Sequence, residues 1–156
     1  MTPYPDQVDQ IMAVMSAAFE PTYGEAWNHR QVSDALILPH TFAIVVDRLG
    51  RLIDGGNPAE PAGFILSRHA ADEEELLLIA VIPDCRGAGL GLSMVKELFL
   101  AAKSRGATRV FLEMRRGNPA ENLYKKVGFE PIGVRSNYYN LSDGQKVDAI
   151  TFGVSI

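Results

Sequence analysis

The chain has 156 residues, the usual length of one globular domain, and its composition (47% hydrophobic, 22% charged) is that of a folded protein. This balance excludes a disordered, collagen-like or disulfide-stabilised chain, and the net charge of −4 argues against a general affinity for nucleic acid or anionic membranes. We therefore expect residues 1–156 to form a single domain.

The hydrophobic pattern alternates between helical and strand-like periods along the chain. Two amphipathic segments come first, and the second ends before Pro39. A stretch rich in glycine, asparagine and proline, Arg48 to Pro61, predicts a surface loop between two antiparallel strands. A later strand, Glu75 to Val81, is so continuously apolar that we expect it to be central in the sheet, with both faces covered.

The expected elements follow the order ααβββαβαββ, which is typical of a three-layer α/β fold with a mixed sheet. In chain order they are helices Val8 to Phe19 and Asn28 to Leu38, strands Thr41 to Val46, Ala62 to Arg68 and Glu75 to Val81, helix Gly89 to Arg105, strand Thr108 to Met114, a short helix capped by Asn118 with Pro119 at its first position and ended by Gly128, and strands Glu130 to Tyr139 and Lys146 to Val154.

Neither a metal site nor a membrane segment is expected. Cys85 is the only cysteine, and the three histidines are scattered, so no metal-ligand spacing and no internal disulfide can be assigned. The longest apolar run, Leu76 to Pro83, is far shorter than the ~20 residues that span a bilayer. The first ten residues lack the basic and apolar regions of a signal peptide, so we expect a cytoplasmic location.

Glycines alternate with other residues in the loop between the central strand and the long helix, Arg86-Gly87-Ala88-Gly89-Leu90-Gly91. Glycine lets the backbone approach a ligand closely. The free N–H groups at the start of the helix point to the same place, and the helix dipole favours negative charge there. The loop therefore predicts an anion site, most simply for a phosphate. The alternative is a tight turn that binds nothing.

Two known phosphate-binding loops fit this stretch poorly. A P-loop would end in Gly-Lys-Ser/Thr, which is absent. A dinucleotide fingerprint could begin at Gly87 and Gly89, with Glu113 as the ribose-binding acid, but Leu92 stands where the third glycine belongs. Too little chain follows Glu113 to build the double βαβαβ sheet that this fingerprint needs, so it remains a weak alternative.

The loop instead resembles the R/Q-x-x-G-x-G/A pyrophosphate loop of the GNAT acetyltransferases. Later segments are similar, in order and spacing, to the RimI-type ribosomal-protein alanine N-acetyltransferases within that family. The resemblance covers Glu73 to Val154. Upstream of Glu73, Trp27 is the single residue that matches. The segments that carry it are Leu112-Glu113-Met114-Arg115, Asn118, Leu123-Tyr124-Lys125-Lys126-Val127-Gly128-Phe129, Arg135-Ser136-Asn137-Tyr138-Tyr139 and Asp148-Ala149-Ile150.

The resemblance implies a GNAT fold with a mostly antiparallel sheet, and acetyl-CoA as the donor substrate. The pyrophosphate of the donor would bind the backbone amides of residues 86–91. Its pantetheine arm would lie between the strand that contains Ile79, Ala80 and Val81 and the strand 108–114. Such an arm is an amide chain that can pair with an unsatisfied strand edge. No metal is implied.

The resemblance assigns the general base to Glu113, which would take the proton of an acceptor amine that attacks the thioester directly. Glu113 interrupts an apolar strand, where we expect desolvation to raise the pKa of its carboxyl. The alternative is a structural ion pair with Arg115, on the same strand face. Glu75 on the neighbouring strand is a second candidate base, acting through water. Cys85 lies in the phosphate loop and is not expected to be a nucleophile.

The resemblance assigns Tyr124 as the acid that protonates the departing CoA thiolate, and a phenol carries its proton at pH 7. A core tyrosine with a satisfied hydroxyl is the alternative. Relatives also contact CoA through an asparagine that matches Asn118. The spacing from Asn118 to Tyr124 is one residue shorter here, so Asn118 also remains open as a helix cap alone.

Tyr138 and Tyr139 would line the acceptor groove in a RimI-type protein, with Glu75 as a further contact. The acidic run Asp72 to Glu75 would attract the basic N-terminus of a ribosomal protein if it lay beside that groove. The acceptor that the resemblance implies is the N-terminal alanine of a ribosomal protein. A polyamine, an aminoglycoside or a lysine side chain remains an alternative acceptor, and a CoA-sensing module without turnover is an alternative of another class.

Overall fold

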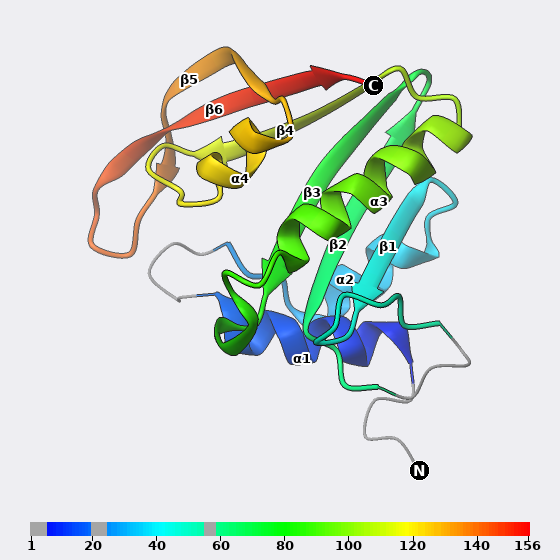
Figure 1. Ribbon diagram of the computed structural model, residues 1–156. Helices are drawn as coiled ribbons and strands as arrows, with labels where there is room; N and C mark the ends of the chain where they lie inside the picture. The colour runs from blue at the N-terminus through cyan, green and yellow to red at the C-terminus, as the bar shows by residue number, and fades with distance from the viewer. Residues whose placement is uncertain (1–5, 20–24, 55–58) are drawn as a thin grey trace.

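The computed structural model describes residues 6–19, 25–54 and 59–156. Figure 1 shows the elements in the predicted order, and the expected α/β fold is confirmed. The helices are α1 (Gln7–Ala18), α2 (His29–Ile37), α3 (Leu90–Ser104) and α4 (Glu121–Lys126), with a 3-10 turn at Pro83–Cys85, and the strands are β1 (Thr41–Val46), β2 (Gly63–Ala70), β3 (Glu73–Val81), β4 (Arg109–Arg115), β5 (Glu130–Asn140) and β6 (Lys146–Ser155).

The six strands form one sheet in the order β1-β2-β3-β4-β6-β5. All neighbours are antiparallel except β3 and β4, which α3 connects in parallel. The sheet separates two apolar clusters. Ile11 and Val14 of α1 and Val32 of α2 pack on one face, whereas Met94 and Leu98 of α3 pack on the other. The helices thus lie on both faces, which is the three-layer arrangement that the order of elements predicted (Figure 1).

The first two helices begin at side-chain caps. The Asp6 carboxylate accepts a hydrogen bond from the Asp9 N–H at 2.8 Å. Asn28 and Gln31 form a reciprocal capping box, each side chain accepting from the backbone N–H of the other at 2.8 Å. These caps satisfy N–H groups that a helix leaves free in its first turn. No helix among the described residues is both long enough and apolar enough to span a membrane.

The predicted start of α4 is wrong. The Asn118 side chain accepts the Ala120 N–H at 2.9 Å, which closes a tight turn, and the helix begins only at Glu121. Asn118 therefore does not cap a helix in which Pro119 is the first residue. An asparagine oxygen can bond its own backbone two residues on, and this turn competes with the helical cap.

The central position of β3 is confirmed, but the expectation that both of its faces are covered is only partly right. Leu77, Leu78 and Ile79 are half-buried. The strand also contains a β-bulge: Leu76 pairs with Ser67 and Leu78 pairs with Leu66, so Leu77 has no partner on β2. A bulge bends the strand and changes which side chains face each side of the sheet.

Candidate active site

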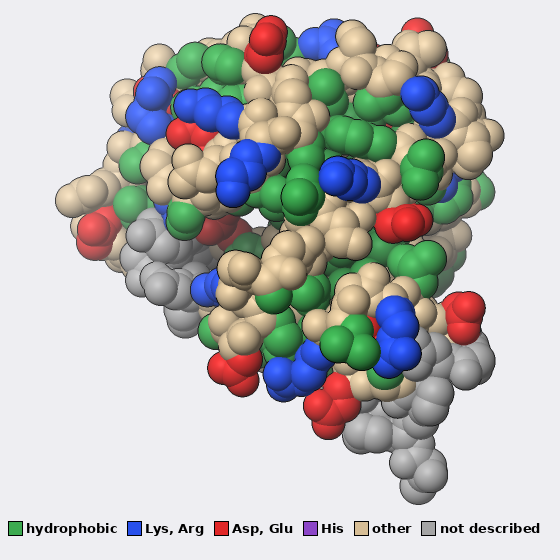
Figure 2. All heavy atoms as spheres, viewed as in Figure 1, with side chains coloured by type: hydrophobic (Ala, Val, Ile, Leu, Met, Phe, Trp, Pro, Cys, Tyr) green, Lys and Arg blue, Asp and Glu red, His purple; other side chains and the backbone are tan. Residues whose placement is uncertain are grey.

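The strand pair β3 and β4 is joined at one end and open at the other. Register partners run only from Glu73 with Arg109 to Glu75 with Phe111, and the two strands then separate (Figure 1). Residues 76–81 of β3 are consequently unpaired along the edge that faces β4. Figure 2 shows the surface hollowed between α4 and the first turns of α3, on the open side of this divergence.

The glycine loop lies at the open end of β3. Gly87 and Gly89 have φ angles of 80° and 84°, in the left-handed region that glycine adopts without strain. A Cβ at either position would meet nothing within 4 Å, so the loop faces open space. Gly89 is the N-cap of α3 and supplies no side-chain hydrogen bond, which leaves the first N–H groups of the helix available to an anion.

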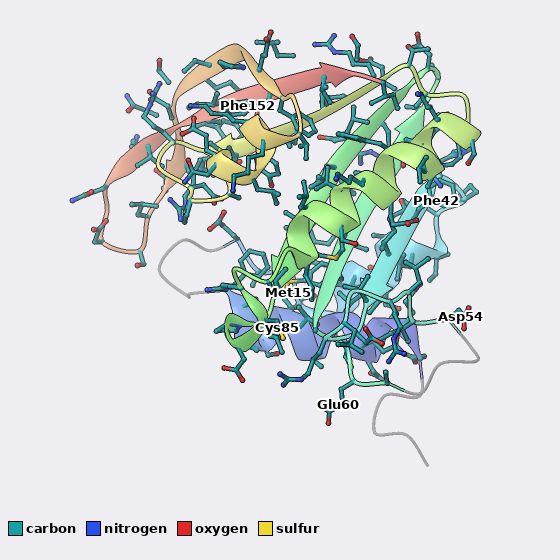
Figure 3. All side chains as sticks on the ribbon, viewed as in Figure 1. Met15, Phe42, Asp54, Glu60, Cys85 and Phe152 are labelled. Atoms are coloured by element: carbon teal, nitrogen blue, oxygen red, sulfur yellow. The ribbon has the colours of Figure 1, made fainter. Side chains whose placement is uncertain are left out.

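Two side chains hold this loop in place. The Arg86 guanidinium donates to the Val81 carbonyl at 3.2 Å and to the Ala18 carbonyl, at the end of α1, at 2.7 Å. The Arg86 side chain therefore anchors the loop to the protein backbone. It serves an anion site by holding the loop in position. Cys85 is buried at the base of the loop (Figure 3), and the Arg48 guanidinium lies 3.6 Å from its sulfur.

Glu113 lies on β4 just beyond the point of divergence. Its carboxylate is paired with Arg135 of β5 at 3.3 Å and lies 3.5 Å from the Thr151 hydroxyl of β6. The Arg115 guanidinium, the alternative ion-pair partner, is paired with the Glu25 carboxylate at 3.3 Å. The carboxylate side chain is 22% exposed, so it is not enclosed as an isolated group in an apolar strand. Glu75 lies on the same sheet face, because its register partner Phe111 is two residues before Glu113.

Tyr124, on α4, is 4% exposed and packs edge-on against Phe129 at a ring distance of 5.6 Å. Burial, reinforced by the negative charge of Glu25, raises the pKa of its phenol far above the ordinary value of 10. The phenol therefore keeps its proton at neutral pH. No hydrogen bond to the hydroxyl is found within the described part of the chain.

Glu25, between α1 and α2, was missed by the sequence reasoning. Its carboxylate is bonded by the Arg115 guanidinium and by the Asn118 side-chain amide, each at 3.3 Å. These contacts connect the segment between α1 and α2 to the end of β4 and to the turn before α4, about 90 positions further along the chain. Glu25 stands two residues before Trp27 in a segment without periodicity, so no pattern in the sequence marked it.

The two tyrosines Tyr138 and Tyr139, here called the tyrosine pair, lie side by side with their rings 5.1 Å apart and nearly perpendicular. The Arg135 guanidinium lies 5.1 Å from the Tyr138 ring while it also pairs with Glu113. Burial is the main cause that raises the pKa of Tyr139, and the neighbouring Glu113 carboxylate adds to it. The tyrosine pair, Arg135 and Glu113 therefore form one cluster.

The acidic run Asp72 to Glu75 is not part of this cluster, so it does not meet the condition under which it would attract a basic N-terminus. It lies at the joined end of β3 and β4, and basic residues neutralise it. Glu73 is paired with Arg109 at 3.8 Å, and Glu75 with Arg68 at 2.6 Å. Glu74 is fully buried.

The Glu74 carboxylate accepts hydrogen bonds from the Ser67 hydroxyl at 2.7 Å and from the Arg105 guanidinium, and lies 3.0 Å from the His69 ring. Arg105 in turn lies over the ring of Phe42, at the far end of α3 (Figure 3). This network joins β2, β3 and the end of α3. Its place in the fold makes it a structural element rather than part of the candidate site.

Comparison with known proteins identifies the family. Residues 40–131 match the model of the acetyltransferase (GNAT) domain. An alanine N-acetyltransferase of ribosomal protein bS18 from Haemophilus influenzae is 34% identical over 88 residues, which are 56% of this chain and 60% of the relative. A Bacillus subtilis protein, whose name proposes the same activity, is 28% identical over 153 residues, 97% of this chain and 91% of its own.

Solved structures lead to the same fold. The crystal structure of the ribosomal-protein-S18-alanine N-acetyltransferase from Escherichia coli superposes with a TM-score of 0.76 at 26% identity, covering 100% of this chain and 93% of the other. An aminoglycoside 6'-N-acetyltransferase complexed with coenzyme A superposes with a TM-score of 0.72 at 18% identity, covering 95% and 89%. The second likeness, at that identity, concerns the fold alone.

Proposed function

Because the chain belongs to the GNAT acetyltransferase family, whose members use acetyl-CoA, we propose that it acetylates the N-terminal α-amine of a protein, with an N-terminal alanine of ribosomal protein bS18 as the first candidate acceptor. The observation that carries the proposal is the position of Glu113, between the open edge of β3 and the tyrosine pair. A carboxylate in that position can reach an amine that enters beside the tyrosines.

The donor half of the proposed site consists of the amides of residues 87–91 and the unpaired edge of β3 at Ile79, Ala80 and Val81, since the Arg86 N–H already donates to the Pro83 carbonyl at 3.2 Å. The amides would bind the pyrophosphate of acetyl-CoA, and the strand edge would pair with the pantetheine amides. Asn118 is already engaged by Glu25 and by the turn before α4. Its side chain would therefore shape the site rather than bind CoA directly.

The chemistry is a direct transfer. The amine nitrogen forms the new amide bond to the acetyl carbonyl as the carbon–sulfur bond breaks, with no covalent acyl-enzyme. Glu113 takes the proton that the amine loses, and Tyr124 supplies a proton to the CoA thiolate. The raised pKa of Tyr124 keeps the phenol protonated until the thiolate forms. The tyrosine pair would contact the first residues of the acceptor.

Ionisation favours an N-terminal acceptor. An α-amine with a pKa near 7.8 is about one-seventh neutral at pH 7, whereas a lysine near 10.4 is neutral in about four molecules in ten thousand. A carboxylate is a much weaker base than an amine, so it suits an amine that is already partly neutral. Glu113 therefore needs to remove a proton from a smaller fraction of α-amine molecules than of lysine side chains before the amine can attack.

The test uses three peptides that begin Ala-Arg and contain internal lysines, mixed with the protein and acetyl-CoA. One has a free N-terminus, one a blocked N-terminus, and one has its lysines replaced. We expect a single acetyl group, placed on the α-amine by tandem mass spectrometry, in the first and third peptides and no transfer to the second. Acetylation of lysine, or turnover only with spermidine or an aminoglycoside, would exclude the proposed acceptor. Binding of acetyl-CoA without release of the CoA thiol in the presence of any of these amines would indicate a sensor.

A further inference from the structure

The strand β5 contains an irregularity opposite Asp148. Arg135 pairs with Ala149 and Tyr139 pairs with Val147. Residues 136–138 of β5 therefore face the single residue Asp148 of β6, and we call these three residues the β5 bulge. Bulges next to active sites commonly redirect a side chain.

The bulge has a strained centre. Asn137 has a φ of 54°, a left-handed conformation that few residues other than glycine adopt readily. Asparagine is one of the residues that tolerate it, at some cost. Such a conformation persists only where the surrounding structure holds it.

The side chain that holds it is Asp148. Its carboxylate accepts the Asn137 N–H at 3.0 Å and pairs with Arg116 at 3.2 Å, while its backbone carbonyl accepts the Arg116 N–H at 2.8 Å. The hydrogen bond from Asn137 is the largest cause that lowers the pKa of Asp148, so the carboxylate is ionised at neutral pH. Asp148 thus connects the β5 bulge to the end of β4.

The bulge determines where the tyrosine pair points. Consecutive residues of a regular strand point to opposite faces of the sheet, so Tyr138 and Tyr139 would be separated by the backbone. Their rings instead contact each other at 5.1 Å. The residue before the bulge, Arg135, reaches both Tyr138 and Glu113. Without the bulge, this cluster would not assemble around the proposed base.

We propose that Asp148 is a positioning residue for the acceptor site: its carboxylate holds the β5 bulge in the shape that places the tyrosine pair beside Glu113. The role rests on the proposed function, because the acceptor is the peptide N-terminus that the tyrosine pair would contact. Asp148 takes no part in proton transfer. It acts on the acceptor through residues 136–139 and leaves the donor loop untouched.

The test compares Asp148→Ala with Asp148→Asn, which keeps an oxygen able to accept the Asn137 N–H. We expect Asp148→Ala to raise the KM for an Ala-Arg peptide about tenfold, the factor that one hydrogen bond to a charged group commonly represents, with the Kd for acetyl-CoA unchanged. Asp148→Asn should retain most of the affinity. Asp143→Ala is the matched control, since Asp143 accepts the Gln145 N–H at 3.0 Å in the turn of the same hairpin.

A second variant separates positioning from general loss of structure. Asn137→Gly in the Asp148→Ala background should lower the peptide KM again, because glycine adopts the left-handed conformation without help. An unchanged KM in Asp148→Ala would overturn the proposal, as would an equal loss of acetyl-CoA affinity. If the unaltered protein acetylates no peptide, the proposed function fails instead. In that case hydrogen exchange tests whether Asp148 holds the β5 bulge. Unchanged protection of the Asn137 amide in Asp148→Ala would overturn this positioning role.

Discussion

Glu113 and Glu75 are two carboxylates on one sheet face, and their partners distinguish them. Glu113 is paired with Arg135 of β5 at 3.3 Å, beside the tyrosine pair, whereas Glu75 is bound by Arg68 at 2.6 Å near the joined end of β3 and β4. The position of Glu75 at the joined end places it away from the tyrosine pair. Glu113 is therefore the better placed candidate for the base.

Glu113→Gln should therefore lower kcat by about 10²-fold at pH 7, within the usual contribution of general base catalysis, while Glu75→Gln should change it little. The loss in Glu113→Gln should be largest at acid pH, where the least amine is neutral. Steady-state kinetics between pH 6 and 9 for both variants provide the measurement. A larger loss in Glu75→Gln than in Glu113→Gln would exchange the two roles.

Tyr124→Phe removes only the phenol oxygen and keeps the ring contact with Phe129. Turnover should fall by about 10² to 10⁴, with the Kd for acetyl-CoA and the melting temperature almost unchanged. Kinetics and calorimetry on the same preparation measure both quantities. Full activity in this variant would mean that Tyr124 is a core residue only.

Among the elements, the glycine loop is the one that would offer a ligand backbone groups, so its function depends on its backbone shape. Gly89 has a φ of 84° and no neighbour within 4 Å of the position that a Cβ would take. A valine there would be strained and would place its methyl groups in the space in front of the free N–H groups of α3. Both effects oppose the binding of an anion.

Gly89→Val should weaken acetyl-CoA binding severely, by tenfold or more, as measured by calorimetry. The matched control is Gly144→Val in the β5–β6 turn, where the glycine has a φ of 87° and equally open surroundings. The two variants carry similar backbone strain, so their melting temperatures should fall alike, but only Gly89→Val should lose donor affinity. Unchanged affinity in folded Gly89→Val would remove the phosphate-loop interpretation.

Sequence periods predicted the elements well because burial imposes those periods directly: α3 buries Leu90, Met94 and Leu98 on one face, as their spacing indicated. The glycine loop could also be recognised, since its residue types follow from local backbone demands. Contacts between segments that are distant in the sequence could not be predicted in this way. The partner of Glu113 is Arg135 rather than Arg115, and Glu25 reaches Asn118, because register and loop path determine those pairs.

Across the whole molecule, the candidate chemistry and the buried ionic network lie at opposite ends of β3 and β4. Glu74, at the joined end, is fully buried and satisfied by Arg105, Ser67 and His69. Burial alone raises the pKa of Glu74, but the hydrogen bonds from Arg105 and Ser67 outweigh it and lower the pKa overall. This end of the sheet stabilises the fold, whereas the open end carries the candidate site.

Glu74→Ala should therefore destabilise the protein by about 3–5 kcal/mol, since it leaves the Arg105 charge without its partner, yet the folded fraction should keep its kcat. Glu73→Ala, which removes a half-exposed carboxylate paired at 3.8 Å, should cost no more than about 0.5 kcal/mol. Thermal unfolding and kinetics below the transition measure the two effects. Loss of kcat in folded Glu74→Ala would contradict the separation of the two ends.

The same network predicts the response to acid. Because the folded pKa of Glu74 lies below its usual value of 4.5, its stabilisation is fully present above that pH and is lost as the pH falls through the folded pKa. Below pH 4.5, the melting temperature should thus fall more steeply with decreasing pH in the unaltered protein than in Glu74→Gln. Parallel slopes in the two proteins would argue against this linkage.

The divergence of β3 and β4 leaves an unpaired strand edge in the middle of a sheet instead of at its margin. A marginal edge, such as that of β5, is open to any extended chain, and β5 carries a proline and charged residues of the kind that discourage such pairing. The edge of β3 is recessed between two strands that meet at Glu75 and Phe111. A chain that pairs with this edge must therefore lie between β3 and β4, next to the glycine loop at the open end of β3.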